Sequence, residues 1–293
     1  MLQLLTLALA ATTAFATPTP ERRDSVVTLT SEQIAPWKNL AYYASAAYCA
    51  SSKIKSWSCG TACKNLATPQ TVYATGGDNA QTPYWYVLNN GSAIIVSVCG
   101  TNALSYASIA VDMDYTPTAP DSTYFPNLSG AKLHHGFYSA FTRIAPGVAT
   151  GVQSGLDAGI TDVIVIGHSL GGAIGHQLAT YLQQKFTSAT VYGRLFASPR
   201  VGNQAWADYV DSTLGTRAQH IVNYNDAVPQ SPSQAMGFQQ SSNEIWIANA
   251  AGTKYIACPG QENKACQDSL AAATGTSVHL GPYAGVTISG CYY

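Results

Sequence analysis

A five-residue motif, Gly-His-Ser-Leu-Gly at positions 167–171, constrains the fold of this chain more than any other feature. A run of Val and Ile, residues 163–166, precedes the motif, and residues 170–186 have the composition of a helix. When a serine lies at a sharp turn from strand to helix, flanking glycines let the two elements approach closely. The motif therefore predicts a buried strand, a strained turn that leaves Ser169 exposed at the strand's carboxyl end, and a helix that begins there.

Ser169 is a candidate nucleophile because of this context. The helix after it directs its N-terminal N–H groups and the positive end of its dipole to the place where an oxyanion forms during acyl transfer. The alternative is a strand–turn–helix unit whose hydroxyl has no chemical role, since short motifs of this kind also occur by chance. A nucleophilic serine needs a base, and the base needs an acid to orient it, so the rest of the chain must supply both.

His279 and Asp226 are the candidates for the base and the acid. In hydrolases with this type of turn the chain order is serine, acid, histidine, and only His279 lies late enough in the chain. Asp226 follows a strand expected at residues 220–224, which places it at a carboxyl end, where sites in α/β sheets gather. The other acids are expected as solvated charges on a helix, in an edge strand or in a polar loop: Asp208, Asp211, Glu244, Glu262 and Asp268.

Two N–H groups are expected to hold the oxyanion. One belongs to Leu170 at the start of the helix, and the other to Thr101, which follows a strand expected at residues 93–98. Preorganised donors of this kind stabilise the charge that develops in the transition state. The alternative for Thr101 is an ordinary turn residue.

Strands and helices alternate along the chain and predict its fold class. Helices are expected at residues 31–49, 137–159 (interrupted by Pro146), 170–186 and 204–214, strands at 84–88, 93–98, 163–166, 190–196 and 220–224, and edge strands at 244–248 and 254–257. This alternation indicates one α/β domain with a largely parallel central sheet covered by helices. With 293 residues, 46% of them hydrophobic, the chain is long enough to build one large core.

The N-terminus has the pattern of a secreted protein. Residues 2–11 form an apolar run, and small residues follow with a cleavage site of the form Ala-Phe-Ala at 14–16, which predicts a signal peptide over residues 1–16. The apolar run is shorter than the ~20 residues that span a bilayer. Residues 17–23 end in two arginines and are interpreted as a propeptide, which leaves residues 24–293 as the mature domain. Charged residues make up 10% of the chain against about 25% on average, which favours an extracellular protein. The net charge of −1 argues against a nucleic-acid partner.

The seven cysteines are expected to pair for the most part in an oxidising compartment. Two pairs are close enough in sequence to close small loops, and a third can tie the two ends of the mature chain together: Cys59 with Cys63, Cys258 with Cys266, and Cys49 with Cys291. Cys99 is then left over. The sequence alone does not fix this connectivity.

Two sequons, at Asn90 and Asn127, are candidate glycosylation sites. The sequence has no metal-ligand spacing and no phosphate-binding loop. The chemistry predicted at Ser169 needs no metal and no other cofactor.

Seven blocks of the sequence, taken in order, resemble the fungal class 3 lipases of the Rhizomucor and Thermomyces type. They extend over nearly the whole mature chain: Ala46-Ala-Tyr-Cys49, Gly100-Thr101, His135-Gly-Phe137, Gly167-His-Ser-Leu-Gly-Gly172, Ser198-Pro-Arg-Val-Gly-Asn203, Asn225-Asp-Ala-Val-Pro229 and Val278-His-Leu-Gly-Pro282. The resemblance implies an α/β-hydrolase fold and ester hydrolysis. It implies the triad Ser169, Asp226 and His279, the oxyanion hole Thr101 and Leu170, and the disulfides Cys49–Cys291 and Cys59–Cys63.

The chain departs from this family pattern at Cys99, and no motif marks the segment that corresponds to the family's lid. The family usually carries Arg before the Gly-Thr pair, where this chain has Cys99, which we interpret as a small buried residue rather than a second nucleophile. Such lipases carry a lid after Thr101, and residues 102–114 are its equivalent by spacing. Their apolar side chains suit a cover that opens toward lipid, and the alternative is a packed helix that does not move. Asp114 is a candidate for orienting the Thr101 hydroxyl.

These observations predict a secreted serine ester hydrolase that acts on acylglycerols at a lipid–water interface, as a monomer without a transmembrane anchor. The alternative on the same scaffold is hydrolysis of feruloyl or other aromatic esters, which the 18 tyrosines keep open. A third interpretation is a secreted lipid-binding protein without catalysis, and the unusual Cys99 is its support.

Overall fold

A nine-stranded sheet forms the centre of the structure, a computed structural model that describes residues 25–66, 70–101, 115–272, 278–288 and 290–291. Its strands lie in the order β1-β11-β10-β9-β8-β7-β4-β3-β2. Their bounds are β1 Val27–Thr28, β2 Thr71–Gly76, β3 Trp85–Asn89, β4 Ile94–Val98, β7 Asp162–His168, β8 Thr190–Phe196, β9 Ala218–Asn223, β10 Glu244–Ile247 and β11 Tyr255–Cys258. Two further strands, β5 (Pro117–Thr118) and β6 (Leu133–His134), pair separately.

The centre of the sheet is parallel and both flanks are antiparallel. Strands β4, β7, β8, β9 and β10 run parallel to their neighbours in this group. Strands β2 and β3 on one side and β11 and β1 on the other pair antiparallel. The expected α/β fold with a largely parallel central sheet is confirmed. The expectation that β10 and β11 are edge strands is wrong, because β10 lies between β9 and β11, and β1 covers the far side of β11.

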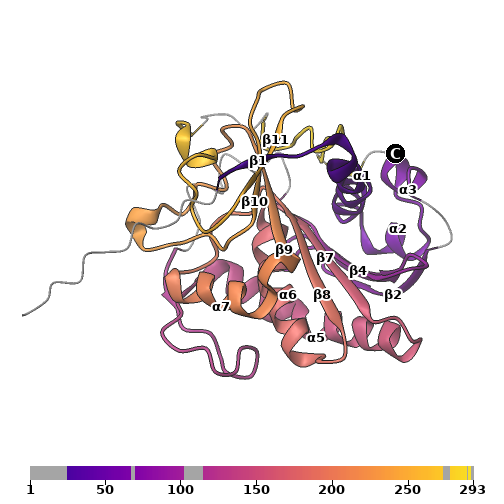
Figure 1. Ribbon diagram of the computed structural model, residues 1–293. Coiled ribbons are helices and arrows are strands. Elements are labelled where there is room, and N and C mark those ends of the chain that lie inside the picture. The colour runs from indigo at the N-terminus through magenta and orange to yellow at the C-terminus, as the bar shows by residue number, and fades with distance from the viewer. Residues whose placement is uncertain (1–24, 67–69, 102–114, 273–277, 289, 292–293) are drawn as a thin grey trace, which may run out of the picture.

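Helices cover both faces of the sheet, as Figure 1 shows. Helices α1 (Ser31–Ala46), α2 (Ser51–Lys55) and α3 (Gly60–Lys64) lie on one face. Helices α5 (His135–Asp157), α6 (Leu170–Lys185) and α7 (Gln204–Leu214) lie on the other. Three short 3-10 helices complete the described elements: η2 Gly215–Arg217, η3 Gln234–Met236 and η4 Gln267–Ser269.

Helix α5 runs through Pro146 without a break, so the expected interruption is wrong. Proline removes one N–H and leaves the carbonyl four residues earlier without its helical partner. Pro146 is exposed, which places the disturbed turn on the solvent side of the helix, where water can solvate that carbonyl. The apolar face of α5 packs undisturbed against the sheet.

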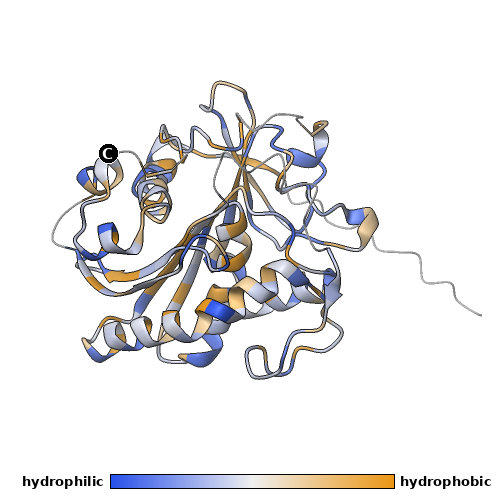
Figure 2. Cartoon of the chain, turned by 180° about the vertical axis from the view of Figure 1, so that it is seen from behind, coloured by the Kyte–Doolittle hydropathy of each residue, from blue (hydrophilic) through white to orange (hydrophobic). Residues whose placement is uncertain are grey.

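The central strands bury side chains on both faces, and this explains their wholly apolar sequence. Along β4, Ile94, Val96 and Val98 pack into a core with α5 and α6, whereas Ile95 between them packs into a second core with α1. Each fully buried side chain of this kind contributes roughly 1.5–3 kcal/mol to folding. Figure 2 shows apolar residues concentrated in these strands and on the inner sides of the helices. Packing in these two cores holds in place the ends of the strands that carry the candidate site.

Six cysteines form three disulfides: Cys49–Cys291, Cys59–Cys63 and Cys258–Cys266. Cys99 is a free, buried thiol. In the part of the chain that is described, no helix combines the length and the apolar character needed to cross a membrane. The predicted signal peptide and propeptide, and the segment 102–114 with Asp114, lie outside the described residues.

Two buried histidines pack together where α6 meets β9. The rings of His176 and His220 lie 5.9 Å apart between centroids, and both side chains are almost fully buried. Burial lowers the pKa of His176 to about 3 and that of His220 to about 4, while Asp211 raises and Arg200 lowers the pKa of His220. Both imidazoles are therefore neutral in the folded protein at pH 7.

We expect this pair to make the protein sensitive to acid. An unfolded histidine binds a proton near pH 6.5, so stability that is complete above that pH is lost as the pH falls toward the lowered folded pKa values. His176→Gln is expected to reduce the loss of unfolding free energy between pH 6.5 and 4 by on the order of 1 kcal/mol per pH unit. Urea unfolding across this range checks it, with His135→Gln, at an exposed histidine, as the control. Equal pH slopes in wild type and His176→Gln would contradict the prediction.

Candidate active site

Ser169 lies at the turn between β7 and α6 in a strained conformation, with φ 61° and ψ −128°. The flanking glycines make this turn possible. A Cβ atom on Gly167 would lie 2.0 Å from the carbonyl oxygen of Gly171, and a Cβ atom on Gly171 would lie 2.2 Å from that of Val98. The Ser169 side chain is buried, with 2% of the residue exposed, so the expected exposure is wrong. The loop at Gly100 packs closely against it: a Cβ atom there would lie 2.9 Å from Ser169 Cβ.

His279 and Asp226 form a buried pair. His279 Nδ1 lies 2.7 Å from Asp226 Oδ2, and each side chain is 1% exposed. The N–H of Val228 donates to the other carboxylate oxygen, 3.0 Å away. Because a carboxylate only accepts hydrogen bonds, Nδ1 carries the proton and Nε2 is the basic nitrogen of the ring. The two residues are 53 positions apart, and Asp226 lies just beyond the end of β9 at Asn223.

The motif histidine, His168, supports His279 in a way that sequence reasoning missed. Its Nε2 donates to the carbonyl oxygen of His279 at 2.9 Å, and the two ring centroids are 4.6 Å apart. Since that nitrogen carries the proton, Nδ1 accepts the hydrogen bond from Tyr48, 2.7 Å away. Burial, with His279 nearby, holds the pKa of His168 well below its usual range. The imidazole of His168, next to Ser169 in the chain, is therefore neutral, has a single tautomer and links Tyr48 to the backbone of His279.

Two further side chains hold the backbone on either side of His279. The hydroxyl of Tyr283 donates to the His279 carbonyl at 2.8 Å. The amide of Asn223, at the end of β9, donates to the Val278 carbonyl at 2.6 Å. The segment that carries His279 is thus fastened to the same strand that leads to Asp226. Asn223 bonds to a backbone group 55 positions away, and no spacing pattern in the sequence marks such a contact.

The loop after β4 lies beside Ser169, where an oxyanion loop is expected. A Cβ atom on Gly100 would also meet the His168 carbonyl at 2.6 Å, so only glycine fits here. Thr101 follows directly and is half-buried, and Leu170 opens α6 on the other side of Ser169. The roles of Thr101 and Leu170 stay predictions.

Cys99 is buried beneath this loop. Its Sγ accepts a hydrogen bond from the N–H of Tyr84 at 3.1 Å and lies 3.6 Å from Asn79 Oδ1. Burial raises the pKa of the thiol to about 12, so it is not ionised at neutral pH. Because the thiolate is the reactive form, Cys99 acts as a small packing residue rather than a nucleophile, as expected from the sequence.

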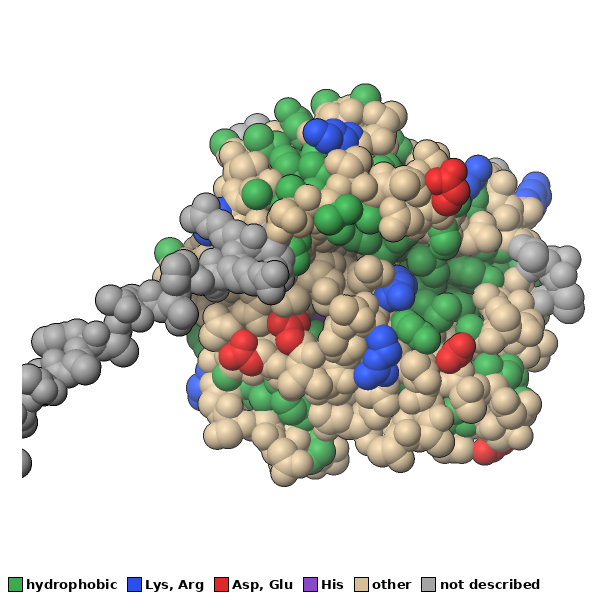
Figure 3. Space-filling model, in the orientation of Figure 1, with side chains coloured by type: hydrophobic (Ala, Val, Ile, Leu, Met, Phe, Trp, Pro, Cys, Tyr) green, Lys and Arg blue, Asp and Glu red, His purple; other side chains and the backbone are tan. Residues whose placement is uncertain are grey.

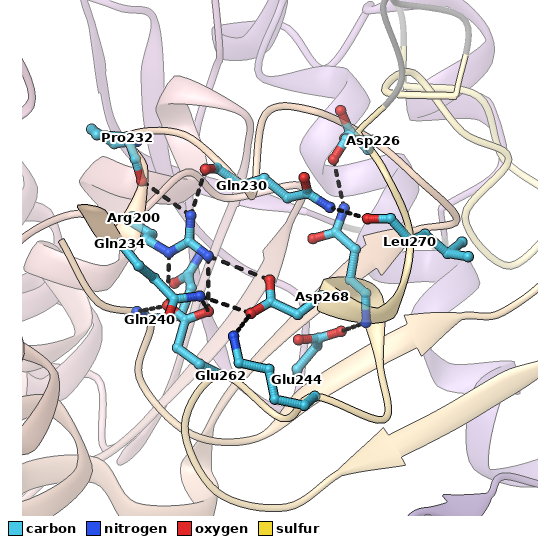
Figure 4. Close-up of polar contacts among 12 residues, drawn as sticks. Arg200, Asp226, Gln230, Pro232, Gln234, Gln240, Glu244, Glu262, Asp268 and Leu270 are labelled. Carbon is cyan, nitrogen blue, oxygen red and sulfur yellow. Dashed lines mark hydrogen bonds and ion pairs between the residues drawn. The ribbon is translucent and has the colours of Figure 1, made fainter. Parts of the chain in front are cut away.

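The other acids have partners of their own. Figure 4 shows the buried Arg200 facing two of them: Glu262, whose carboxylate oxygens lie 2.7 and 2.8 Å from the guanidinium, and Asp268, at 3.6 Å. Asp211 was expected to be a solvated charge, but it accepts hydrogen bonds from the N–H and the hydroxyl of Ser242 at 2.9 and 2.7 Å. Glu244 accepts from the N–H of Gln267 at 3.1 Å. These acids fasten loops together, which leaves Asp226 as the acid on His279.

Two remaining expectations concern metals and glycans. Ligand atoms of Glu244, Cys258 and Cys266 lie within 4.8 Å of one another, but the two sulfurs form a disulfide and offer no thiolate to a metal. Asn127 is exposed. Asn90 is half-buried, and its side-chain oxygen accepts hydrogen bonds from the turn at Ser92. Glycosylation at both asparagines stays a prediction.

Figure 3 shows few, scattered charged side chains on the face in view, without a basic patch.

The strained serine turn, with a buried His–Asp pair at the carboxyl ends of a parallel sheet, defines an α/β-hydrolase. Comparison with known proteins narrows this class. A family model described as lipase (class 3) matches residues 95–236. The secreted mono- and diacylglycerol lipase MDL3 of Malassezia globosa is 35% identical over 218 residues, which cover 73% of this chain and 71% of that protein. MDL4 of the same organism is 34% identical, and the match covers 67% of this chain and 66% of MDL4.

A solved structure agrees with these sequence matches. The crystal structure of the lipase from Rhizopus microsporus var. chinensis has 30% sequence identity and a TM-score of 0.82, and the match covers 94% of this chain and 95% of that one. This chain belongs to the class 3 lipase family.

Proposed function

We propose that this protein is a secreted lipase that hydrolyses acylglycerols through Ser169, His279 and Asp226. The buried pair of His279 and Asp226, 2.7 Å apart, carries the proposal, because it supplies an oriented base that is in contact with His168, the chain neighbour of the strained Ser169. A serine turn with only a structural role does not require a buried histidine–aspartate pair. Three disulfides suit an oxidising compartment, and the matched Malassezia proteins are named secreted lipases.

In the proposed mechanism, the Ser169 hydroxyl attacks the ester carbonyl while Nε2 of His279 takes its proton. Asp226 holds the imidazole in the tautomer with the proton on Nδ1 and stabilises the imidazolium that forms. The N–H groups of Thr101 and Leu170 bind the oxyanion of the tetrahedral intermediate. The imidazolium then gives its proton to the departing alcohol, and water, activated by His279, releases the fatty acid from the acyl-enzyme. Burial of the pair keeps these interactions in a low dielectric, where they are strongest.

The substrate class follows from the family and from the names of the relatives. MDL3 and MDL4 are named mono- and diacylglycerol lipases, so we propose acylglycerols as the substrates. We also propose that the protein acts as a monomer at a lipid–water interface, since one chain supplies the whole triad. The 18 tyrosines keep hydrolysis of aromatic esters as the alternative, although at least three of them have packing roles: Tyr86 lies in the core, and Tyr124 and Tyr181 pack against Phe141.

The test is the release of acid by the purified protein from emulsified tri-, di- and monoacylglycerols, in parallel with a feruloyl ester. Hydrolysis of glycerides at least 10-fold faster than the feruloyl ester is the expected result, and the relative glyceride rates define the preference. Cleavage of the aromatic ester alone would keep the mechanism and overturn the substrate class. A folded protein that cleaves none of these esters and does not react with a serine-directed phosphonate would overturn the proposal as a whole.

A further inference from the structure

The disulfide loop after β11 reaches back to the proposed catalytic acid. The loop is closed by Cys258–Cys266, and η4 begins with the next residue, Gln267. Gln267 is 4% exposed, and its side-chain amide donates a hydrogen bond to the carbonyl oxygen of Asp226 at 2.5 Å. These two residues are 41 positions apart, so the contact is made by the fold and not by local turn geometry.

Gln267 is itself held from both sides. Its N–H donates to Glu244 at the start of β10, 3.1 Å away. The next residue, Asp268, lies 3.6 Å from the guanidinium of Arg200, which is also paired with Glu262 in the same loop. Arg200 is buried and donates to the carbonyls of Gln230 and Pro232 as well. Figure 4 shows this network extending from Arg200 through η4 to Asp226. The backbone of Gln267 is therefore held in place, and its buried side chain reaches Asp226 from this fixed point.

Every polar atom of Asp226 has a partner when Gln267 is counted. The N–H donates to the Asn223 carbonyl at 3.0 Å, one carboxylate oxygen accepts from Val228 and the other from His279. Asp226 lies beyond the end of β9, so no strand ladder fixes its carbonyl. The side-chain amide of Gln267 donates the hydrogen bond that holds this carbonyl. A carbonyl fixed in this way fixes the peptide plane and, through it, the direction of the side chain.

We propose that Gln267 is a positioning residue for the triad: it holds the backbone of Asp226 so that the carboxylate stays aligned with Nδ1 of His279. The proposal rests on the proposed function, since it concerns the same triad. Misalignment of a catalytic group by about 1 Å lowers rates by up to about 100-fold. At metal sites, loss of the residues that orient the ligands lowers activity by about 10- to 100-fold. Without the amide, the peptide after Asp226 can rotate and the pair with His279 loosens.

The experiment compares Gln267→Met with wild type. Methionine has nearly the same volume but no donor. The matched control is Gln230→Met, because the Gln230 amide donates at 3.4 Å to Leu270 near the same loop, whereas the hydrogen bonds given for Asp226 go to other residues. Activity is measured on a soluble short-chain ester, with the active sites counted by a phosphonate. We expect kcat per active site to fall roughly 10- to 100-fold in Gln267→Met, with KM within about twofold, and no such change in Gln230→Met.

Two readouts separate positioning from a merely structural role. A loosened Asp226 stabilises the imidazolium less, so the acid limb of kcat/KM is expected to move to lower pH in Gln267→Met. The low-field proton NMR signal of the His279–Asp226 hydrogen bond is expected to weaken or disappear. Loss of active sites without a change in kcat per site, in the acid limb or in the NMR signal would overturn the proposal.

A second variant covers the case in which Gln267→Met does not fold. Gln267→Glu keeps the shape of the side chain and donates a hydrogen bond only when the introduced carboxyl is protonated. Its activity relative to wild type is expected to decrease as the pH rises through the titration of that carboxyl, and a constant ratio would overturn the proposal. An inactive wild-type enzyme would overturn the proposed function, whereas full activity in both Gln267 variants would overturn only this inference.

Discussion

Ser169→Ala is expected to lower kcat for every ester by about 10⁴- to 10⁶-fold while the fold stays intact. The alanine removes the attacking oxygen but leaves the oxyanion donors and the pair of His279 and Asp226 in place. The backbone strain at φ 61° is the same for alanine as for serine, since neither side chain favours this region. The melting temperature is therefore expected to change by no more than about 3 °C.

The measurement is steady-state hydrolysis of an emulsified glyceride and of a soluble ester by both proteins, together with labelling by a serine-reactive phosphonate and mass analysis of the labelled peptide. Ser198→Ala is the matched control, because Ser198 is equally buried and its hydroxyl bonds only to the neighbouring carbonyl of Pro199 in the contacts described. We expect label on wild type and Ser198→Ala and none on Ser169→Ala. Residual activity of Ser169→Ala above about 1% of wild type would place the nucleophile elsewhere.

The strained turn at Ser169 and the choice of Asp226 and His279, which the structure pairs, were predictable from local patterns and from chain order. The serine has its flanking glycines, the acid follows a strand, and the histidine is the only one late enough in the chain. Their supporting residues were not predictable. His168 contacts Tyr48 across 120 positions and His279 across 111, and such contacts leave no spacing in the sequence. Gln267 lies in a loop that looked merely polar, because its role depends on the backbone of a distant residue.

The same distinction holds for the fold. The central strands β4, β7, β8 and β9 were predictable because burial on both faces requires an apolar sequence. Strand β2 was missed because its side chains are only half-buried, and β1 because it has two exposed residues and exists through its pairing with β11. The burial of Ser169 was also missed. Burial of a side chain depends on tertiary packing, such as the close approach of the Gly100 loop, which the motif does not set.

The bond between Cys49 and Cys291 is expected to have the largest effect on stability of the three disulfides. It joins residues 242 positions apart and ties the C-terminal segment to the end of α1. That segment also carries His279, and its residues Tyr283 and Ile288 pack in the core beside α1. If disulfides act mainly by restricting the unfolded chain, a loop of this length is worth about 5 kcal/mol, whereas the loop between Cys59 and Cys63, with a separation of 4, is worth about 2 kcal/mol.

The double variant Cys49→Ser/Cys291→Ser is therefore expected to lose about 3–5 kcal/mol of unfolding free energy, and Cys59→Ser/Cys63→Ser no more than about 2 kcal/mol. Urea unfolding and calorimetry of both variants measure this difference. Activity followed against temperature adds a second observation: fraying of the freed C-terminus removes His279 from Asp226, so ester hydrolysis should fail below the global melting temperature in the first variant only. Equal losses in the two variants would mean that packing of Tyr283 and Ile288, rather than the covalent bond, holds the histidine segment in place.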